Sequence, residues 1–188
     1  MQFKLILYLL FITFSYTQIN AKDVGSNTGL KVPRFVTLKS DDVNLRVGSS
    51  TNYPLILKYT TKNLPLQVTE EYQYWRKIID INGNVGWIHK NLLKGERHAI
   101  IKESEFLIKI YSKPNGKLIG EIGQFNIVKI NICLPYWCKI NYKNINGWIV
   151  KKKLWGVFEN EKINIPFYQP VINQIWRLNL SNFLIFLK

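Results

Sequence analysis

One motif occurs twice in this sequence, about sixty residues apart. The first copy has Tyr-Trp-Arg-Lys-Ile at 74–78 and Gly-Trp-Ile at 86–88, and the second has Tyr-Trp-Cys-Lys-Ile at 136–140 and Gly-Trp-Ile at 147–149. The order of the motifs and the spacing between them are nearly the same in both copies. Such a repeat predicts two copies of one small structural unit, each close to the lower size limit for a domain that folds alone.

We place the two units at 36–97 and 99–158, with 159–188 as a linker and C-terminal extension. The junction at 95–98 is short, so we expect the units to lie against each other rather than to move on a long tether.

The pattern inside each unit predicts β-strands and no long helix. Apolar and polar residues alternate over 64–69, which is typical of a half-buried strand. Asn82-Gly83 predicts a tight hairpin turn, and we expect a longer loop at 143–147 in the second unit. Short strands separated by turns predict an all-β fold, a small closed barrel or sandwich.

The N-terminal segment 1–21 has the layout of a secretory signal peptide. Lys4 precedes an apolar run at 5–14, which is too short to span a bilayer, and a polar stretch ends at the small residue Ala21. We therefore expect an exported protein of the periplasm or cell envelope; an uncleaved anchor is the alternative.

Cys133 and Cys138 are separated by four residues. In an oxidising compartment this pair predicts a structural disulfide. No further Cys or His accompanies them, so a zinc site is not expected. We predict no metal and no cofactor.

The formal net charge is +14, which favours association with anionic surfaces such as phospholipids, acidic wall polymers or nucleic acid. Lys, Asn and Ile are all abundant, however, and 151–153 is the only tight lysine run. Codon bias and solubility explain the charge more simply, and we expect no specific nucleic-acid partner.

The repeated segments resemble the bacterial Src-homology-3-like domain, SH3b. The resemblance is carried by 43–55, 74–78 and 86–93, and more weakly by the second copy, whose start at 108–115 departs from the pattern. The whole arrangement is similar to exported tandem-SH3b proteins of the alphaproteobacterial type. The resemblance implies two small, strongly bent barrels that bind envelope material, often peptidoglycan or its peptides, without catalysis.

Aromatic residues near the repeated strands are the candidate ligand groove. They are Tyr53, Tyr72, Tyr74, Trp75, Tyr136 and Trp137. For Trp75 and Trp137, core packing is an equally good interpretation. His89 and Leu92 stand where eukaryotic relatives carry the Pro and Tyr of a polyproline groove, so that mode of recognition is not expected.

Four further residues of the motif are assigned structural roles. Gly86 and Gly147 permit a close approach to the backbone or a bulge. For Trp87 and Trp148 we favour core packing over a groove.

No catalytic site is predicted. His89 and His98 have no neighbouring Cys or paired Asp that would indicate a metal site or a triad. The acidic pairs at 41–42 and 70–71 are interpreted as solvated turn residues, because neighbours on an extended chain point to opposite faces.

The C-terminal tail combines a proline-containing linker at 163–170 with apolar residues at helical spacing over 172–187. It is too short and polar to span a membrane. Docking on a barrel is favoured over contact with a membrane surface, and a strand or disorder stays open.

These features predict an exported, non-enzymatic module that recognises envelope material or a periplasmic protein. The alternative is a scaffold or adaptor that binds a protein partner or a membrane surface through the barrels or the tail.

Overall fold

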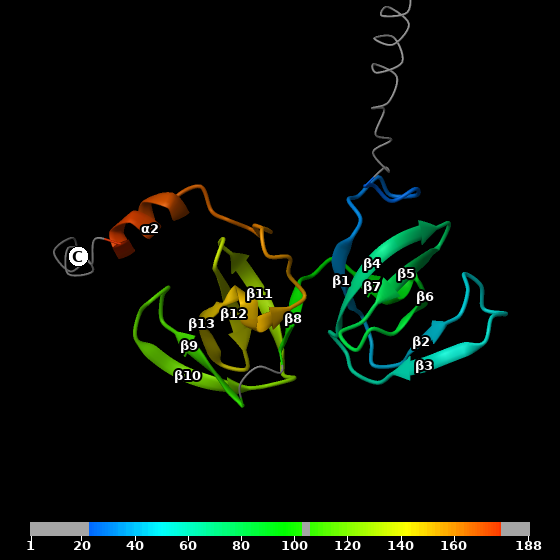
Figure 1. Cartoon of the computed structure of the whole chain (residues 1–188), viewed down its shortest axis with the longest axis horizontal. Helices are drawn as coiled ribbons and strands as arrows, with labels where there is room; N and C mark the ends of the chain where they lie inside the picture. The colour runs from blue at the N-terminus through cyan, green and yellow to red at the C-terminus, as the bar shows by residue number, and fades with distance from the viewer. Residues whose placement is uncertain (1–22, 103–105, 178–188) are drawn as a thin grey trace, which may run out of the picture.

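The computed structural model describes residues 23–102 and 106–177, and the predicted signal segment 1–21 lies outside them. Figure 1 shows two compact β units side by side, followed by one helix next to the second unit. The first unit contains β1 (Arg34–Leu38), β2 (Val43–Arg46), β3 (Leu55–Tyr59), β4 (Pro65–Tyr72), β5 (Trp75–Ile79), β6 (Val85–His89), the 3-10 turn η1 (Lys90–Leu92) and β7 (Leu93–Lys94). The second contains β8 (His98–Ile101), β9 (Leu107–Tyr111), β10 (Leu118–Gly123), β11 (Ile127–Cys133), β12 (Trp137–Tyr142), β13 (Ile145–Val150), η2 (Lys151–Lys153) and β14 (Leu154–Trp155).

The two sheets have the same topology. The first has the strand order β3-β2-β6-β5-β4-β1-β7, and the second has β10-β9-β13-β12-β11-β8-β14, all antiparallel. Each strand of the second sheet therefore takes the place of the strand seven positions earlier in the chain. The predicted duplication and the all-β fold of two small barrels are confirmed, whereas the predicted domain limits stay predictions.

Each barrel has its own apolar core, formed by inward-facing residues that alternate along the strands. The fully buried residues of the first core include Leu38, Leu45, Leu66, Ile78 and Ile88. Those of the second include Ile101, Ile110, Ile140, Ile149 and Leu154. Burial of one such side chain contributes about 1.5–3 kcal/mol, so the alternation in the sequence is also the main source of stability.

The hairpin turns of the two units differ, and the longer loop predicted at 143–147 is wrong. In the second unit, Tyr142 pairs directly with Ile145, which leaves a two-residue turn. In the first unit, the Asp80 carboxylate accepts hydrogen bonds from the backbone amides of Asn82 and Asn84, each at 2.9 Å, and holds a wider turn. The Asp80 carboxylate therefore stabilises a wider turn in the first unit than the tight turn that Asn82-Gly83 predicted.

Gly86 and Gly147 have the role predicted for them. A Cβ on Gly86 would lie 2.7 Å from the carbonyl oxygen of Arg46, and one on Gly147 would lie 2.3 Å from Cγ2 of Ile110. Only glycine lets β2 and β9 approach this closely.

The two barrels are packed together at their junction, as the short linker predicted. The ring of Phe35 lies 5.1 Å from that of Trp155 and 4.8 Å from that of Phe158. Arg97 donates to both carboxylate oxygens of Glu161, and its side chain also lies over Phe35.

The C-terminal extension returns to the second barrel. Ile163 is buried and exchanges both backbone hydrogen bonds with Cys133 at the end of β11. The helix α2 (Gln169–Arg177) follows, and its Trp176 contacts Trp148 edge-on at 5.5 Å. Docking on a barrel is thus confirmed for the described part of the tail; no helix in that part of the chain is long and apolar enough to cross a bilayer.

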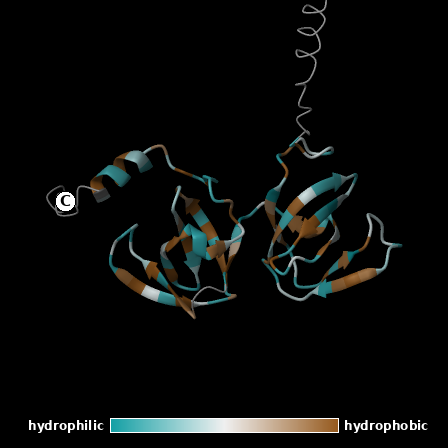
Figure 2. Cartoon of the chain, in the orientation of Figure 1, coloured by the Kyte–Doolittle hydropathy of each residue, from teal (hydrophilic) through white to brown (hydrophobic). Residues whose placement is uncertain are grey.

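The edge strands of the two sheets expose apolar side chains at equivalent places. Leu55 and Ile56 on β3 and Leu118 and Ile119 on β10 are all exposed, and Figure 2 shows both strands as largely hydrophobic. An unpaired apolar edge of this kind offers a surface for pairing with another chain.

Candidate functional site

A hollow of about 460 Å³ opens beside the β4–β5 hairpin of the first barrel, and we call it the tyrosine hollow. It is lined by Asn27, Thr28, Gln73, Tyr74, Arg76 and Lys90. Tyr74 is 59% exposed at the hairpin turn, and its ring stacks on His89 at 6.1 Å. Lys90 places its ammonium 4.9 Å from the centre of the same ring. The hollow therefore offers an aromatic face, cations and amide groups.

Trp75 belongs to the same cluster. Its ring lies edge-on to His89 at 5.5 Å, because Trp75 and His89 are direct partners across β5 and β6. It faces away from the buried side of β5, and its side chain is only partly buried. This placement supports the groove interpretation over core packing.

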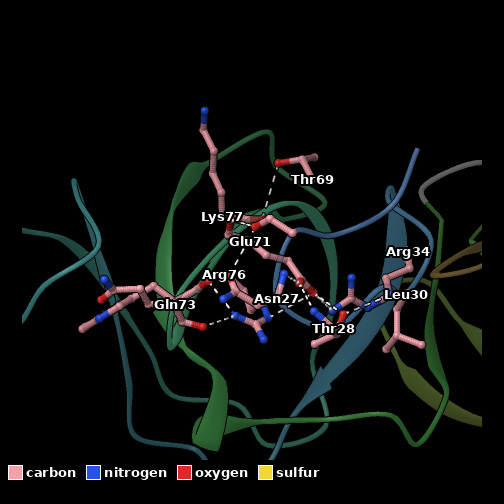
Figure 3. A network of polar contacts seen from close by, with 11 residues as sticks. Asn27, Thr28, Leu30, Arg34, Thr69, Glu71, Gln73, Arg76 and Lys77 are labelled. Carbon is pink, nitrogen blue, oxygen red and sulfur yellow. Dashed lines mark hydrogen bonds and ion pairs between the residues drawn. The ribbon is translucent and has the colours of Figure 1, made fainter. Parts of the chain in front are cut away.

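The floor of the site is a buried charge network around Glu71 (Figure 3). The side chain of Glu71 is fully buried and lies 2.6 Å from Arg34 Nη2 and 3.3 Å from Arg76 Nε. The backbone amides of Asn27 and Thr28 donate to its second oxygen at 3.0 and 2.9 Å. The interpretation of Glu71 as a solvated turn residue is therefore wrong. It is covered by the N-terminal segment 23–32, which we call the N-terminal arm and which forms a turn closed by a β-bridge between Val24 and Lys31. The strand pattern did not predict this arm.

The network sets the ionisation of its members. Burial raises the pKa of Glu71, but hydrogen bonds from Thr28, Arg34 and the backbone of Asn27 outweigh it and lower the pKa to about 2. Burial lowers the pKa of Arg76, and the Glu71 carboxylate opposes this effect. The site is therefore held together by a charged carboxylate over the physiological pH range.

The second barrel has a counterpart hollow of about 330 Å³. Tyr136, 79% exposed, and Trp137 line it, and Trp137 contacts Tyr111 edge-on at 5.5 Å. Asn173 and Trp176 of α2 form part of its wall. The C-terminal helix thus contributes to the second hollow, whereas the N-terminal arm contributes to the tyrosine hollow.

The same position of the hairpin is fixed by different chemistry in the two units. Glu71 and Arg76 are cross-strand partners on β4 and β5. Cys133 and Cys138 are cross-strand partners on β11 and β12, and they form the predicted disulfide. Since Arg76 and Cys138 each follow the Trp of the repeat, the ion pair and the disulfide are structural equivalents.

The remaining predicted aromatic residues lie apart from the cluster. Tyr53 packs over Gly48, and Tyr72 is exposed on β4. Neither makes a ring contact with Tyr74 or Trp75 in the described chain.

The core interpretation of the two Gly-Trp tryptophans is wrong for Trp87. Trp87 is partly exposed on the outer face of β6, opposite the core. Trp148 is 4% exposed but lies outside the core cluster, covered by Trp176. The difference arises because α2 covers only the second barrel.

Several residues of the site were not predicted from the sequence. His89 and Lys90 follow the Gly-Trp-Ile segment directly, and their position after a strand was the only local signal. Asn27 and Thr28 precede the first predicted strand, where the residues themselves carry no strand pattern.

Neither histidine is placed as a catalytic base. His89 Nδ1 accepts a hydrogen bond from the amide of Asn91, and its ring is held between Tyr74 and Trp75. His98 is buried, and burial lowers its pKa. Within 23–102 and 106–177, no group of three or more His, Cys, Asp or Glu is arranged to hold a metal ion.

The lysine run at 151–153 is not a simple basic patch. Lys151 is buried, and its ammonium donates to the backbone carbonyls of Glu159 and Glu161 at 3.1 and 2.7 Å. This lysine anchors the segment after β14 rather than contacting an anionic surface.

Part of the first barrel is similar to a known family of domains. Residues 39–95 match the family model described as Bacterial SH3 domain. This part of the first barrel contains Tyr74, Trp75, His89 and Lys90. The bacterial SH3 family is associated with cell-wall binding modules.

Comparison with curated proteins found no match. Two solved structures, of NlpC2 and NlpC1 from Trichomonas vaginalis, are similar at 15% and 16% identity. Their TM-scores are 0.31 and 0.28, and each match covers 70% of this chain. The matched regions span 51% and 48% of those chains, about half of their length, and likeness at this level says nothing about activity.

Proposed function

We propose that this protein is an exported, non-enzymatic module that binds cell-envelope material, with peptidoglycan or its peptides as the ligand class. The observation that carries the proposal is the position of the tyrosine hollow: it opens on the barrel whose sequence matches the bacterial SH3 domain. The disulfide supports an oxidising, extracytoplasmic compartment.

The chemistry of the hollow fits a peptide that carries carboxylates. The exposed face of Tyr74 offers apolar contact area, and Lys90 beside it offers a positive charge. Asn27 and Gln73 can form hydrogen bonds with amide groups. No nucleophile paired with a base is needed for this role.

We assign binding to the first barrel. Tyr74 and Tyr136 are equivalent residues of the repeat, but the hollow at Tyr136 is walled by α2. Two cations, Arg76 and Lys90, line the hollow at Tyr74, whereas Lys113 is the one cation that lines the hollow at Tyr136. The second barrel then acts as a structural partner.

Co-sedimentation of the mature protein with purified peptidoglycan sacculi tests the assignment. The Tyr74→Ala variant is expected to lose most of the retained fraction, since the aromatic contact face is removed. The Tyr136→Ala variant is the matched control and is expected to be retained like the wild type. Retention that is lost in Tyr136→Ala and kept in Tyr74→Ala would refute the assignment, and wild-type retention no better than that of denatured protein would refute the function.

The non-enzymatic role has its own test. A zymogram on peptidoglycan is expected to show no clearing by the full chain. Clearing that survives repurification would contradict it.

A second candidate is an adaptor that binds a protein partner, favoured by the exposed apolar edges of β3 and β10. Replacing Leu55 and Leu118 by lysine would abolish such binding while leaving retention on sacculi unchanged. A membrane-surface role of the tail is tested by deleting the residues after Pro170: unchanged fractionation argues against it.

A further inference from the structure

A second hollow of the first barrel is strongly cationic. It has a volume of about 390 Å³, and we call it the arm groove. It lies between the N-terminal arm, β1, and β7 with the junction residues that follow it. Its basic side chains are Arg34, Arg76, Lys90, Lys94 and Arg97. Its apolar side chains include Leu30, Phe35, Val36, Val68 and Leu93.

The positive charge of the arm groove is only partly compensated. No carboxylate lines it. Glu71 pairs with two arginines of the groove, Glu96 pairs with Lys94, and Glu161 pairs with Arg97. Lys90 has no carboxylate partner among the described residues. The five cations of the groove therefore have three carboxylate partners, none of which lines the groove.

Two guanidinium groups of the groove also have unused donors. Arg34 Nη1 and Arg97 Nε are shielded from water and have no hydrogen-bond partner. An unpaired buried donor costs about 1–3 kcal/mol, more when charged. An oxyanion in the groove would give these donors an acceptor after a small shift of either side chain.

The arm groove adjoins the tyrosine hollow, because Arg76 and Lys90 line both. Together the two hollows are lined by Tyr74, by the side-chain amides of Asn27 and Gln73, and by the cations and apolar side chains of the groove. Charge, amide groups and apolar area on two adjoining hollows match an acidic peptide better than a compact ion.

From this geometry we infer that the arm groove binds the carboxylates of an acidic peptide. Lys90 lines both the groove and the tyrosine hollow, and it contacts the anionic end of the peptide. The inference goes beyond the proposed function, because it concerns a soluble peptide whether or not the protein is retained on sacculi. Phosphate-bearing lipid is the rival source of anions.

The test is calorimetric titration of the full mature chain with a capped Ala-Glu-Ala-Glu-Ala peptide and with its Gln-containing counterpart. The acidic peptide is expected to bind and the neutral one is not, and binding should weaken as salt is raised. Equal binding of both peptides, or affinity that is independent of salt, would overturn the inference. Vesicles containing anionic lipid that bind while the acidic peptide does not would also overturn it.

Two variants locate the site. Lys90→Gln is expected to weaken the affinity for the acidic peptide roughly two- to fivefold. Lys62 is an exposed lysine of the same barrel outside both hollows, and Lys62→Gln should leave the affinity unchanged. Gly95 lines the groove, and a Cβ there would meet no atom within 4 Å. Gly95→Asp therefore adds a competing carboxylate without a steric clash and should weaken binding about tenfold, with Gly95→Asn as its uncharged control.

Failure of this inference can be distinguished from failure of the proposed function. If Tyr74→Ala is no longer retained on sacculi but still binds the acidic peptide, the groove inference is supported independently of the proposed function. Gly95→Asp and Gly95→Asn that bind the acidic peptide equally would refute it, whatever the result on sacculi.

Discussion

The Glu71→Gln substitution tests the central charge network of the first barrel. The variant keeps an acceptor oxygen and nearly the same volume, but it leaves Arg34 and Arg76 buried without a counter-charge. Removal of one partner from a buried ion pair typically costs about 3–5 kcal/mol. We expect a loss of this order at pH 7.

The pH dependence gives an independent value for the same interaction. The pKa of Glu71 falls from its ordinary value of 4.5 to about 2 in the folded protein. A lowered folded-state pKa contributes stability that is present above the unfolded-state pKa and is lost as pH falls through the folded-state pKa. The shift corresponds to about 3 kcal/mol, lost between about pH 5 and pH 2.

The assay is urea unfolding of the wild type and the variant at pH 7 and pH 3, with hydrogen exchange to localise the loss to β4 and β5. The difference between the two proteins should be largest at pH 7 and should shrink towards pH 2. Glu70→Gln is the matched control, because its partner is Lys77 in an exposed pair at 2.8 Å, for which less than about 1 kcal/mol is expected. The reasoning is refuted if Glu71→Gln costs no more than Glu70→Gln, or if the difference does not shrink at low pH.

Two further predictions concern the second barrel. The double variant Cys133→Ala, Cys138→Ala should lose about 2 kcal/mol in urea unfolding, and reductant should bring the wild type to the same value and leave the variant unchanged. Gly147→Ala should lose about 1–3 kcal/mol, because its Cβ would lie 2.3 Å from Ile110, whereas Gly95→Ala should be neutral because its Cβ meets no atom within 4 Å. Equal melting temperatures for the two glycine variants would contradict the steric argument.

The features that were predictable from the sequence are those that local patterns determine. Alternation of apolar residues sets which face of a strand is buried, so the strands and the two cores followed from the repeat. Gly86 and Gly147 were predictable for the same reason, since a close approach of strands requires glycine at one fixed place.

The features that escaped prediction depend on segments outside the repeat. Glu71 is buried because the N-terminal arm at 23–32 covers it, and the residues around Glu71 in the sequence do not indicate that another segment packs on it. Trp87 and Trp148 are equivalent in the repeat but differ in burial, because Trp176 reaches only the second. A duplicated sequence predicts a duplicated fold, but it does not predict different coverage of the two copies by the chain ends.

The contrast between Glu71–Arg76 and Cys133–Cys138 shows how one fold meets the same requirement twice. In both barrels the end of the central hairpin must be held, and in both a segment outside the repeat is attached there: the N-terminal arm on Glu71, and Ile163 on Cys133. A buried ion pair is sensitive to acid and indifferent to reductant, whereas a disulfide has the opposite sensitivities. The two hollows built on these hairpins are therefore held by independent chemistry. A condition that loosens one hollow leaves the other in place, so the assignment of binding to the first barrel can be tested in the intact chain: reductant should leave binding unchanged.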